Sequence, residues 1–186
     1  MEFDLSSGET VELPNAADWI DPVVVDNETT IRFAVFDNDP WGSYEFPDNV
    51  QFVQGNWKYL HYCNDPGEWM EEIDEDPTLD LYLVGVYEHS GIEYSLAGTS
   101  LHSADQFDYC VGAAIAIPNL EHEYGFTDTR ETAKAILAEY TGWCNGECYV
   151  AVDFTKDPET GEWSETSSCS GYYGRDRIED ALKEGF

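Results

Sequence analysis

Basic side chains are scarce in this sequence of 186 residues, which has 8 Lys and Arg against 39 Asp and Glu and a formal net charge of -31. None of the basic residues lies between Tyr59 and Thr129. A surface of this charge repels the phosphates of nucleic acid and the headgroups of anionic lipids. We therefore expect neither direct nucleic-acid binding nor membrane binding.

Long apolar segments are lacking too. No apolar run approaches the roughly 20 residues that cross a bilayer, and Met1–Ser7 has neither the basic nor the apolar region of a secretory signal. The cysteines are odd in number and lack the spacing of a disulfide framework; they are Cys63, Cys110, Cys144, Cys148 and Cys169. These absences favour a cytoplasmic protein with reduced thiols.

Enough core material is nevertheless present. The sequence is 42% hydrophobic with 15% aromatic residues, so we expect a single folded domain over residues 1–186 with one core. Repulsion among the carboxylates destabilises a compact state unless counterions screen it, and molar salt shortens the Debye length to about 3 Å. The charge therefore predicts a protein adapted to a high-salt cytoplasm.

Several segments have the apolar pattern of strands. Apolar residues alternate in Thr30–Phe36 and in Leu79–Glu88, and Ile92–Leu96 is predicted to return from the latter as a hairpin partner. The continuous apolar run Val111–Ile117 ends at Pro118 and is typical of a central strand buried on both faces.

Helices are predicted in three places. Asp128 and Glu131 form a capping box before a helix of about residues 128–141, and short helices are expected at about 67–75 and 176–183. Between the helices at 128–141 and 176–183, apolar residues alternate in Cys148–Phe154 as in a strand. A turn at 157–161 would return Trp163–Ser170 as the partner of this strand. The pattern predicts an α+β fold, with a mostly antiparallel sheet packed by one main helix.

An acidic stripe is predicted on the helix at 67–75. Carboxylates recur there at helical spacing beside Trp69, and they are Glu68, Glu71, Glu72 and Glu75. The stripe is interpreted either as a solvated helix face or as a surface that docks a protein partner. The candidate for the dense charge of a DNA mimic is the stretch from Tyr59 to Thr129, which has no basic residue and contains the cluster from Glu68 to Asp76.

Metal-binding patterns are incomplete. The run Asp74–Asp76 with Asp80 lacks the spacing and central Gly of a calcium loop. Cys144 and Cys148 have a permissible zinc-knuckle spacing, and Cys169 would lie nearby if the two last strands pair, but a second clean pair is missing. We therefore expect no metal site and no cofactor, and interpret these thiols as small apolar residues.

Catalytic motifs are equally weak. A nucleophile would need a neighbouring imidazole and an orienting acid, and the most suggestive cluster is Glu88-His89-Ser90 at the predicted hairpin tip. His89 would act as base, with Ser90, Glu88 or Cys169 assisting. The same residues equally close a turn through side-chain hydrogen bonds, and no phosphate-binding loop or nucleophile elbow accompanies them.

Four short motifs occur in order over roughly residues 79–182. They are Tyr87-Glu88-His89-Ser90-Gly91-Ile92, Val111-Gly112, Tyr140-Thr141-Gly142-Trp143-Cys144-Asn145-Gly146-Glu147-Cys148-Tyr149, and Ser168-Cys169-Ser170-Gly171-Tyr172-Tyr173-Gly174. In this order they resemble a group of small uncharacterised proteins encoded by bacteriophages, archaeal viruses and mobile elements. The chain departs from that group at Ser170, where the relatives have Trp. The resemblance implies a viral or mobile-element origin and no particular chemistry.

Three functional hypotheses follow. In the first, the chain is an accessory protein of a halophilic virus or mobile element that binds a host or viral protein and antagonises a host defence system acting on nucleic acid, as a DNA mimic would. In the second, it is a small hydrolase that uses the hairpin at residues 88–95. In the third, it is a virion component that contacts another copy or another capsid protein. The sequence does not determine the oligomeric state.

Overall fold

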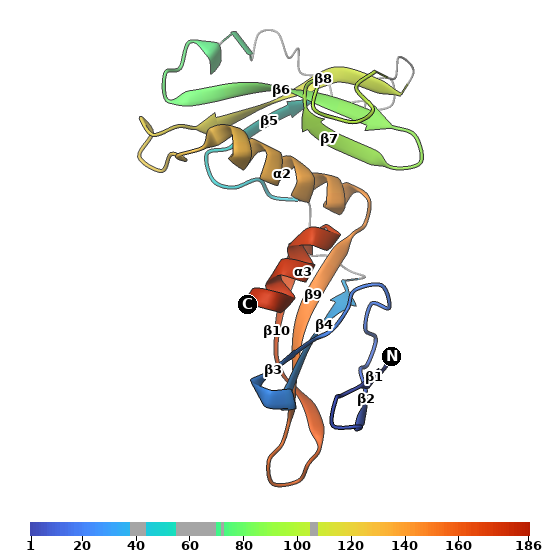
Figure 1. The fold of residues 1–186 in the computed structure, drawn as a ribbon. Helices are drawn as coiled ribbons and strands as arrows, with labels where there is room; N and C mark the ends of the chain where they lie inside the picture. The colour runs from blue at the N-terminus through green and yellow to red at the C-terminus, as the bar shows by residue number, and fades with distance from the viewer. Residues whose placement is uncertain (38–43, 55–69, 72, 105–107) are drawn as a thin grey trace. The chain divides into compact units, whose positions relative to one another are not determined.

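The computed structural model describes residues 1–37, 44–54, 70–71, 73–104 and 108–186. The chain divides into two compact units, one formed by residues 1–42 and 146–186 and the other by residues 43–145. Each unit has its own four-stranded sheet and its own helix (Figure 1). The α+β class with mostly antiparallel strands is therefore confirmed, with two main sheets in place of one. The single domain over residues 1–186 stays a prediction.

The first unit contains an N-terminal hairpin and a sheet with the strand order β10-β9-β4-β3. Every pairing in it is antiparallel. Its elements are β1 (Glu2–Asp4), β2 (Thr10–Glu12), β3 (Val23–Val25), the 3-10 helix η1 (Asp26–Glu28), β4 (Thr30–Phe36), β9 (Cys148–Lys156), β10 (Trp163–Tyr173) and α3 (Arg175–Glu184). The strand expected at 30–36 and the returning hairpin after residue 148 are both present.

Strand alternation gives this sheet two apolar faces. On one face, Ile178 and Leu182 of α3 are fully buried against Ala34 and Ala151. The helix predicted at about 176–183 therefore forms, and it buries Ile178 and Leu182 while Ala181 is half-buried.

The opposite face of the sheet packs against the N-terminal segment. Leu5, Val11 and Leu13 are buried there with Phe33 of β4 and Val152 of β9. This unit therefore has two apolar clusters, one on each face of the sheet.

A polar contact holds the N-terminal hairpin to the far end of β9 and β10. Lys156 Nζ lies 2.5 Å from one Glu9 carboxylate oxygen, and Trp163 Nε1 donates to the other at 2.9 Å. These two hydrogen bonds lower the pKa of Glu9, that of Lys156 having the larger effect. Because both contacts come from the last strand pair, they tie residues at the two ends of the chain.

The second unit contains a sheet with the strand order β5-β8-β6-β7, again antiparallel throughout. Its elements are β5 (Gln51–Gln54), β6 (Leu79–Glu88), β7 (Ile92–Leu96), β8 (Tyr109–Pro118) and α2 (Thr129–Cys144). The predicted hairpin of β6 and β7 is confirmed. So is the central position of the apolar run in β8, where residues 113–118 are all buried.

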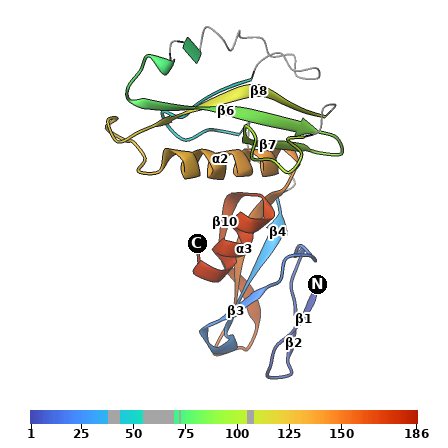
Figure 2. The same ribbon diagram turned by 45° about the horizontal axis from the view of Figure 1, so that its top comes forward.

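Helix α2 covers one face of this second sheet (Figure 2). Asp128 accepts a hydrogen bond from the Glu131 N–H at 3.0 Å, as expected from the capping box. The helix runs past Gly142, near which its end was predicted, and Gly142 is buried within it. It ends where Gly146 takes the left-handed φ of 75°.

The helix predicted at 67–75 lies partly outside the described residues. Met70, Glu71, Ile73 and Asp74 are helical, and Ile73 is 6% exposed. Residues 67–69 and 72 are not described.

Candidate functional site

The hairpin tip between β6 and β7 brings His89 to an acid. His89 Nδ1 lies 2.9 Å from an oxygen of Asp108, and the Glu88 N–H donates to the Asp108 carbonyl at 2.9 Å. The acid that contacts the His89 ring is therefore Asp108. No local signal points to Asp108, because only the register of β6 with β8 brings it to the hairpin.

The arrangement at this tip is that of an exposed turn. The His89 side chain is 66% exposed and that of Asp108 is 30% exposed, and Ser90 is exposed as well. Cys169 belongs to the other unit, on β10, where it is exposed. A catalytic role for Glu88, His89, Ser90 or Cys169 stays a prediction.

The predicted acidic stripe is described only in part. Glu71 and Glu75, which precede and follow the buried Ile73 in the sequence, are both exposed. Glu68, Trp69 and Glu72 lie outside the described residues. A stripe that docks a partner therefore stays a prediction.

Two of the four sequence motifs contact each other in the second unit. The Ile92 N–H donates to Asn145 Oδ1 at 2.9 Å, and Asn145 Nδ2 donates to the Ile92 carbonyl at 2.8 Å. One turn earlier on α2, Thr141 Oγ1 accepts from the Tyr94 N–H at 2.9 Å. The end of α2 thus satisfies backbone groups of β7, which is the edge strand of this sheet. We attribute a structural role to this contact.

Another polar network of the second unit fixes the start of α2. Thr129 Oγ1 donates to Asp80 at 2.6 Å, and Asn119 Nδ2 donates to the other oxygen of Asp80 at 3.0 Å. These hydrogen bonds, first that of Thr129, lower the pKa of Asp80. Tyr82 OH lies 2.8 Å from Thr129 Oγ1. Asp80 and Tyr82 belong to β6 and Thr129 to α2, so this network joins the start of α2 to β6.

An aromatic cluster lies between the sheet and the C-terminal half of α2. Gln54 Nε2 donates to the hydroxyl of Tyr94 at 2.8 Å and to that of Tyr140 at 3.3 Å. Burial raises the pKa of both phenols, that of Tyr140 to about 12. Both hydroxyls are therefore neutral at physiological pH.

Neither of the thiols that have a zinc-knuckle spacing is exposed, since Cys144 is half-buried and Cys148 is buried. Burial raises the pKa of Cys144 and of Cys148, so neither is a thiolate at neutral pH. Within the described ranges, no three His, Cys, Asp or Glu side chains are grouped so as to hold a metal ion.

In the first unit, two hydrogen bonds fix the direction of the backbone groups of β9. The Asp37 N–H donates to the Cys148 carbonyl, and the Lys156 N–H donates to the Thr29 carbonyl, both at 2.9 Å. Both bonds lie on the β4 side, and backbone groups alternate between the two sides along an antiparallel strand. The even-numbered residues of β9 therefore bond to β4 and the odd-numbered ones to β10.

This alternation leaves backbone groups of β10 without a partner strand in the described part of the chain, although the Cys169 thiol donates to the Ser170 carbonyl at 3.7 Å. Ser167 and Cys169 lie opposite odd-numbered residues of β9, so their backbone groups bond inward. Ser168 and Ser170 consequently turn their N–H and C=O groups outward. β10 is the edge strand, and no strand within the described ranges pairs with this outer side.

The open edge is short and rich in hydroxyl groups. Register shifts occur between Glu165 and Ser167 and between Ser170 and Tyr172, which confines regular pairing to residues 167–170. All residues from 164 to 170 are exposed. β10 also contains neither Lys nor Pro, the residues that commonly protect an edge strand.

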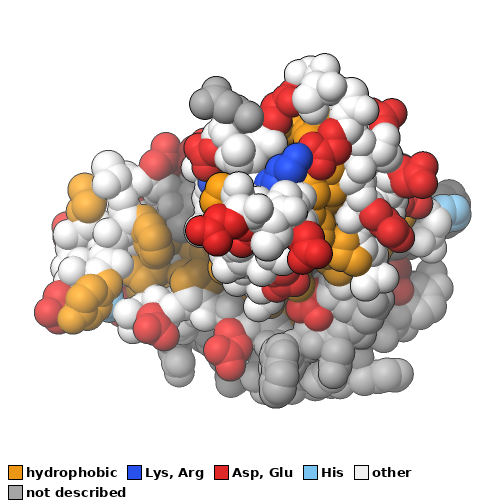
Figure 3. Space-filling model, turned by 90° about the horizontal axis from the view of Figure 1, so that it is seen from below, with side chains coloured by type: hydrophobic (Ala, Val, Ile, Leu, Met, Phe, Trp, Pro, Cys, Tyr) orange, Lys and Arg blue, Asp and Glu red, His pale blue; other side chains and the backbone are white. Residues whose placement is uncertain are grey.

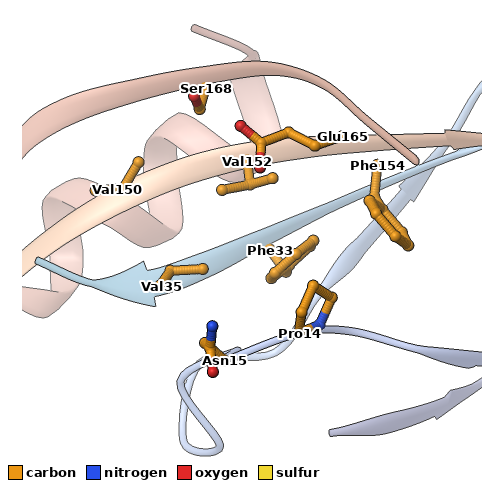
Figure 4. A pocket seen from close by; sticks show the side chains of 9 residues that line it. All are labelled: Pro14, Asn15, Phe33, Val35, Val150, Val152, Phe154, Glu165 and Ser168. Carbon is orange, nitrogen blue, oxygen red and sulfur yellow. The ribbon is translucent and has the colours of Figure 1, made fainter. Parts of the chain in front are cut away.

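A cavity of about 250 Å³ adjoins this edge, on the face of the sheet that the N-terminal segment covers in part. Figure 4 shows apolar side chains of β4 and β9 on its floor and the Glu165 carboxylate turned toward Val152. Its lining consists of Pro14, Asn15, Phe33, Val35, Val150, Val152, Phe154, Glu165 and Ser168. The cavity and the open edge therefore share Ser168.

Acidic side chains are spread over the face of the molecule in Figure 3, and few basic ones appear among them. On this face the carboxylates are therefore not gathered into one patch. No helix in the described part of the chain is long and apolar enough to cross a membrane. In comparison with known proteins, no family model, no curated protein and no solved structure matches the chain.

Proposed function

We propose that this chain is a protein-binding protein, and that the outer edge of β10 takes up an extended segment of another protein. The observation that carries the proposal is the outward backbone of Ser168 and Ser170 beside an apolar cavity. Addition of a strand to an exposed sheet edge uses main-chain hydrogen bonds for affinity and side-chain pockets for specificity.

The charge of the chain favours a partner over a second copy. Two copies that paired their β10 edges would bring Glu165 and a net charge of -31 from each chain together. Like charges at such short range are destabilising. A basic or neutral segment of another protein has no such repulsion to overcome.

The accessory role predicted from the sequence is the setting that we propose for this binding. A host or viral protein would be the partner, and a halophilic virus or mobile element the source. Antagonism of a defence system through DNA mimicry is a further form of the same proposal, for which the exposed carboxylates of Glu71 and Glu75 offer partial support. A mimic should displace duplex DNA from a host nuclease, and joint neutralisation of Glu68, Glu71, Glu72 and Glu75 should abolish the displacement.

Peptides selected from a random display library at molar KCl provide a test of the edge. Ser168→Pro removes the outward N–H of this residue, whereas the inward bonds of Ser167 and Cys169 to β9 stay in place. Ser168→Ala is the matched control, since it retains that N–H. We expect the selected peptide to bind the wild type and Ser168→Ala with equal affinity. Its affinity for Ser168→Pro should be lower by about tenfold or more. Equal binding to both variants would refute strand addition at this edge.

A further inference from the structure

The cavity beside β10 has the chemistry of a site for a basic side chain. Its floor is made of Phe33, Val150 and Val152, and Glu165 is the one acidic residue of its lining, which contains no basic residue. Lys and Arg combine an apolar stem of three or four carbons with a charged head, and they bury the stem while the head stays near polar groups. Lining and carboxylate match the two parts of such a side chain.

The geometry of strand addition favours a long side chain. An added strand would lie about 5 Å beyond β10, and side chains directly opposite Ser168 share its face of the sheet. Ser168 lies opposite Val152, so this is also the face of the cavity. A side chain must therefore extend over β10 to reach Val152, which a short residue such as Ala does not do.

The position of Glu165 argues against other occupants. An aliphatic side chain in the cavity would remove water from the carboxylate without giving it a partner, which is unfavourable. An acidic side chain would be repelled by Glu165. Arg meets both requirements best, because its planar head pairs with a carboxylate through two hydrogen bonds.

We infer that the cavity binds an Arg or Lys side chain of the segment that pairs with β10, an inference that rests on the proposed function. Glu165 would then determine specificity, by pairing with the head of that side chain. The outward backbone of Ser168 and Ser170 would hold the segment in register.

The test compares a selected peptide that contains Arg with the same peptide carrying citrulline, which is close in shape to Arg but uncharged. With the wild type, we expect the citrulline peptide to bind about tenfold more weakly. With Glu165→Gln, the two peptides should bind within about twofold of each other. Glu162→Gln is the matched control, because it removes one exposed carboxylate of the adjacent turn that does not line the cavity. It should retain the wild-type preference.

A second variant addresses the cavity itself. Ser168→Phe places a ring at an exposed strand position on the rim of the cavity and leaves the backbone edge in place. It should abolish the preference for Arg while the peptide continues to slow amide exchange at residues 168 and 170.

The outcomes separate the inference from the proposed function. If no peptide slows exchange at the amides of residues 168 and 170, the proposed function is wrong, and the inference with it. If a peptide slows exchange there but Arg and citrulline bind equally to the wild type, only the inference is wrong. If those amides become protected in a concentration-dependent dimer without peptide, the occupant is a second copy, and both are overturned.

Discussion

Replacement of Asn145 by Ala should destabilise the second unit measurably. Its side chain makes three hydrogen bonds, accepting from the Ile92 N–H at 2.9 Å and donating to the carbonyls of Ile92 at 2.8 Å and Thr141 at 3.0 Å. The φ of Asn145 is -88°, which Ala adopts without strain. The loss of stability in Asn145→Ala therefore reports on these hydrogen bonds.

The expected magnitude follows from the exposure of the site. Each intramolecular hydrogen bond contributes about 0.5–1.5 kcal/mol net. Asn145 is exposed, so water replaces part of what is lost, and we expect the free energy of unfolding to fall by about 1–2 kcal/mol. For a chain of this length, Tm falls by about 2–4 °C per kcal/mol.

Amide exchange distinguishes this local effect from a general one. The Ile92 amide should exchange faster in Asn145→Ala, whereas amides in the centre of β8 should change only as much as global stability does. Thr141→Ser is the matched control, since it retains the hydroxyl that accepts from the Tyr94 N–H. An Asn145→Ala variant with unchanged Tm and an unchanged Ile92 exchange rate would refute the view that α2 protects the edge of β7.

Three further predictions concern the solvent and the titrating groups. Thermal stability should rise steeply from low to molar KCl, because counterions screen a net charge of -31; a melting temperature independent of salt would contradict the salt adaptation. A chelator should leave the melting curve unchanged, because burial keeps the thiols of Cys144 and Cys148 protonated; stoichiometric zinc in protein purified under reducing conditions would contradict this. The pKa of Tyr140 lies at about 12 in the folded chain against an ordinary value of 10.0, so its contribution to stability is complete below about pH 10 and is lost as the pH rises toward 12. In urea titrations, the free energy of unfolding should fall less between pH 9 and 12 for Tyr140→Phe than for the wild type. An equal fall in both proteins would exclude ionisation of Tyr140 as the cause of the lost stability.

Local elements of the fold were predictable because they depend on near neighbours in the sequence. The bounds of β4, β6 and β7 follow from apolar alternation, and the start of α2 from its capping residue. The end of α2 was predicted too early, because Gly142 is tolerated where it is buried and the left-handed conformation of Gly146 ends the helix.

Pairings between distant segments were not predictable in this way. Nothing in the sequence around Thr30–Phe36 indicates that it pairs with Cys148–Lys156, which lies beyond the whole second unit. For the same reason Asp108 was missed beside His89, and so was the cavity, whose lining comes from four separate segments of the chain. Glu165 and Ser168 have no distinctive local pattern, and their importance follows only from the register of β10 with β9.

The interrupted course of the first unit has a consequence for synthesis on the ribosome. Residues 1–42 are made before the second unit, yet β4 finds its partner β9 only after residues 43–145 have been made. The second unit is continuous in sequence, so its sheet and α2 have all their strands available earlier. Domains generally form as units during synthesis at about 5–20 residues per second. The N-terminal segment therefore waits several seconds with Ile31 and Phe33 exposed, and in that interval it is the part of the nascent chain most exposed to chaperones, proteases and aggregation.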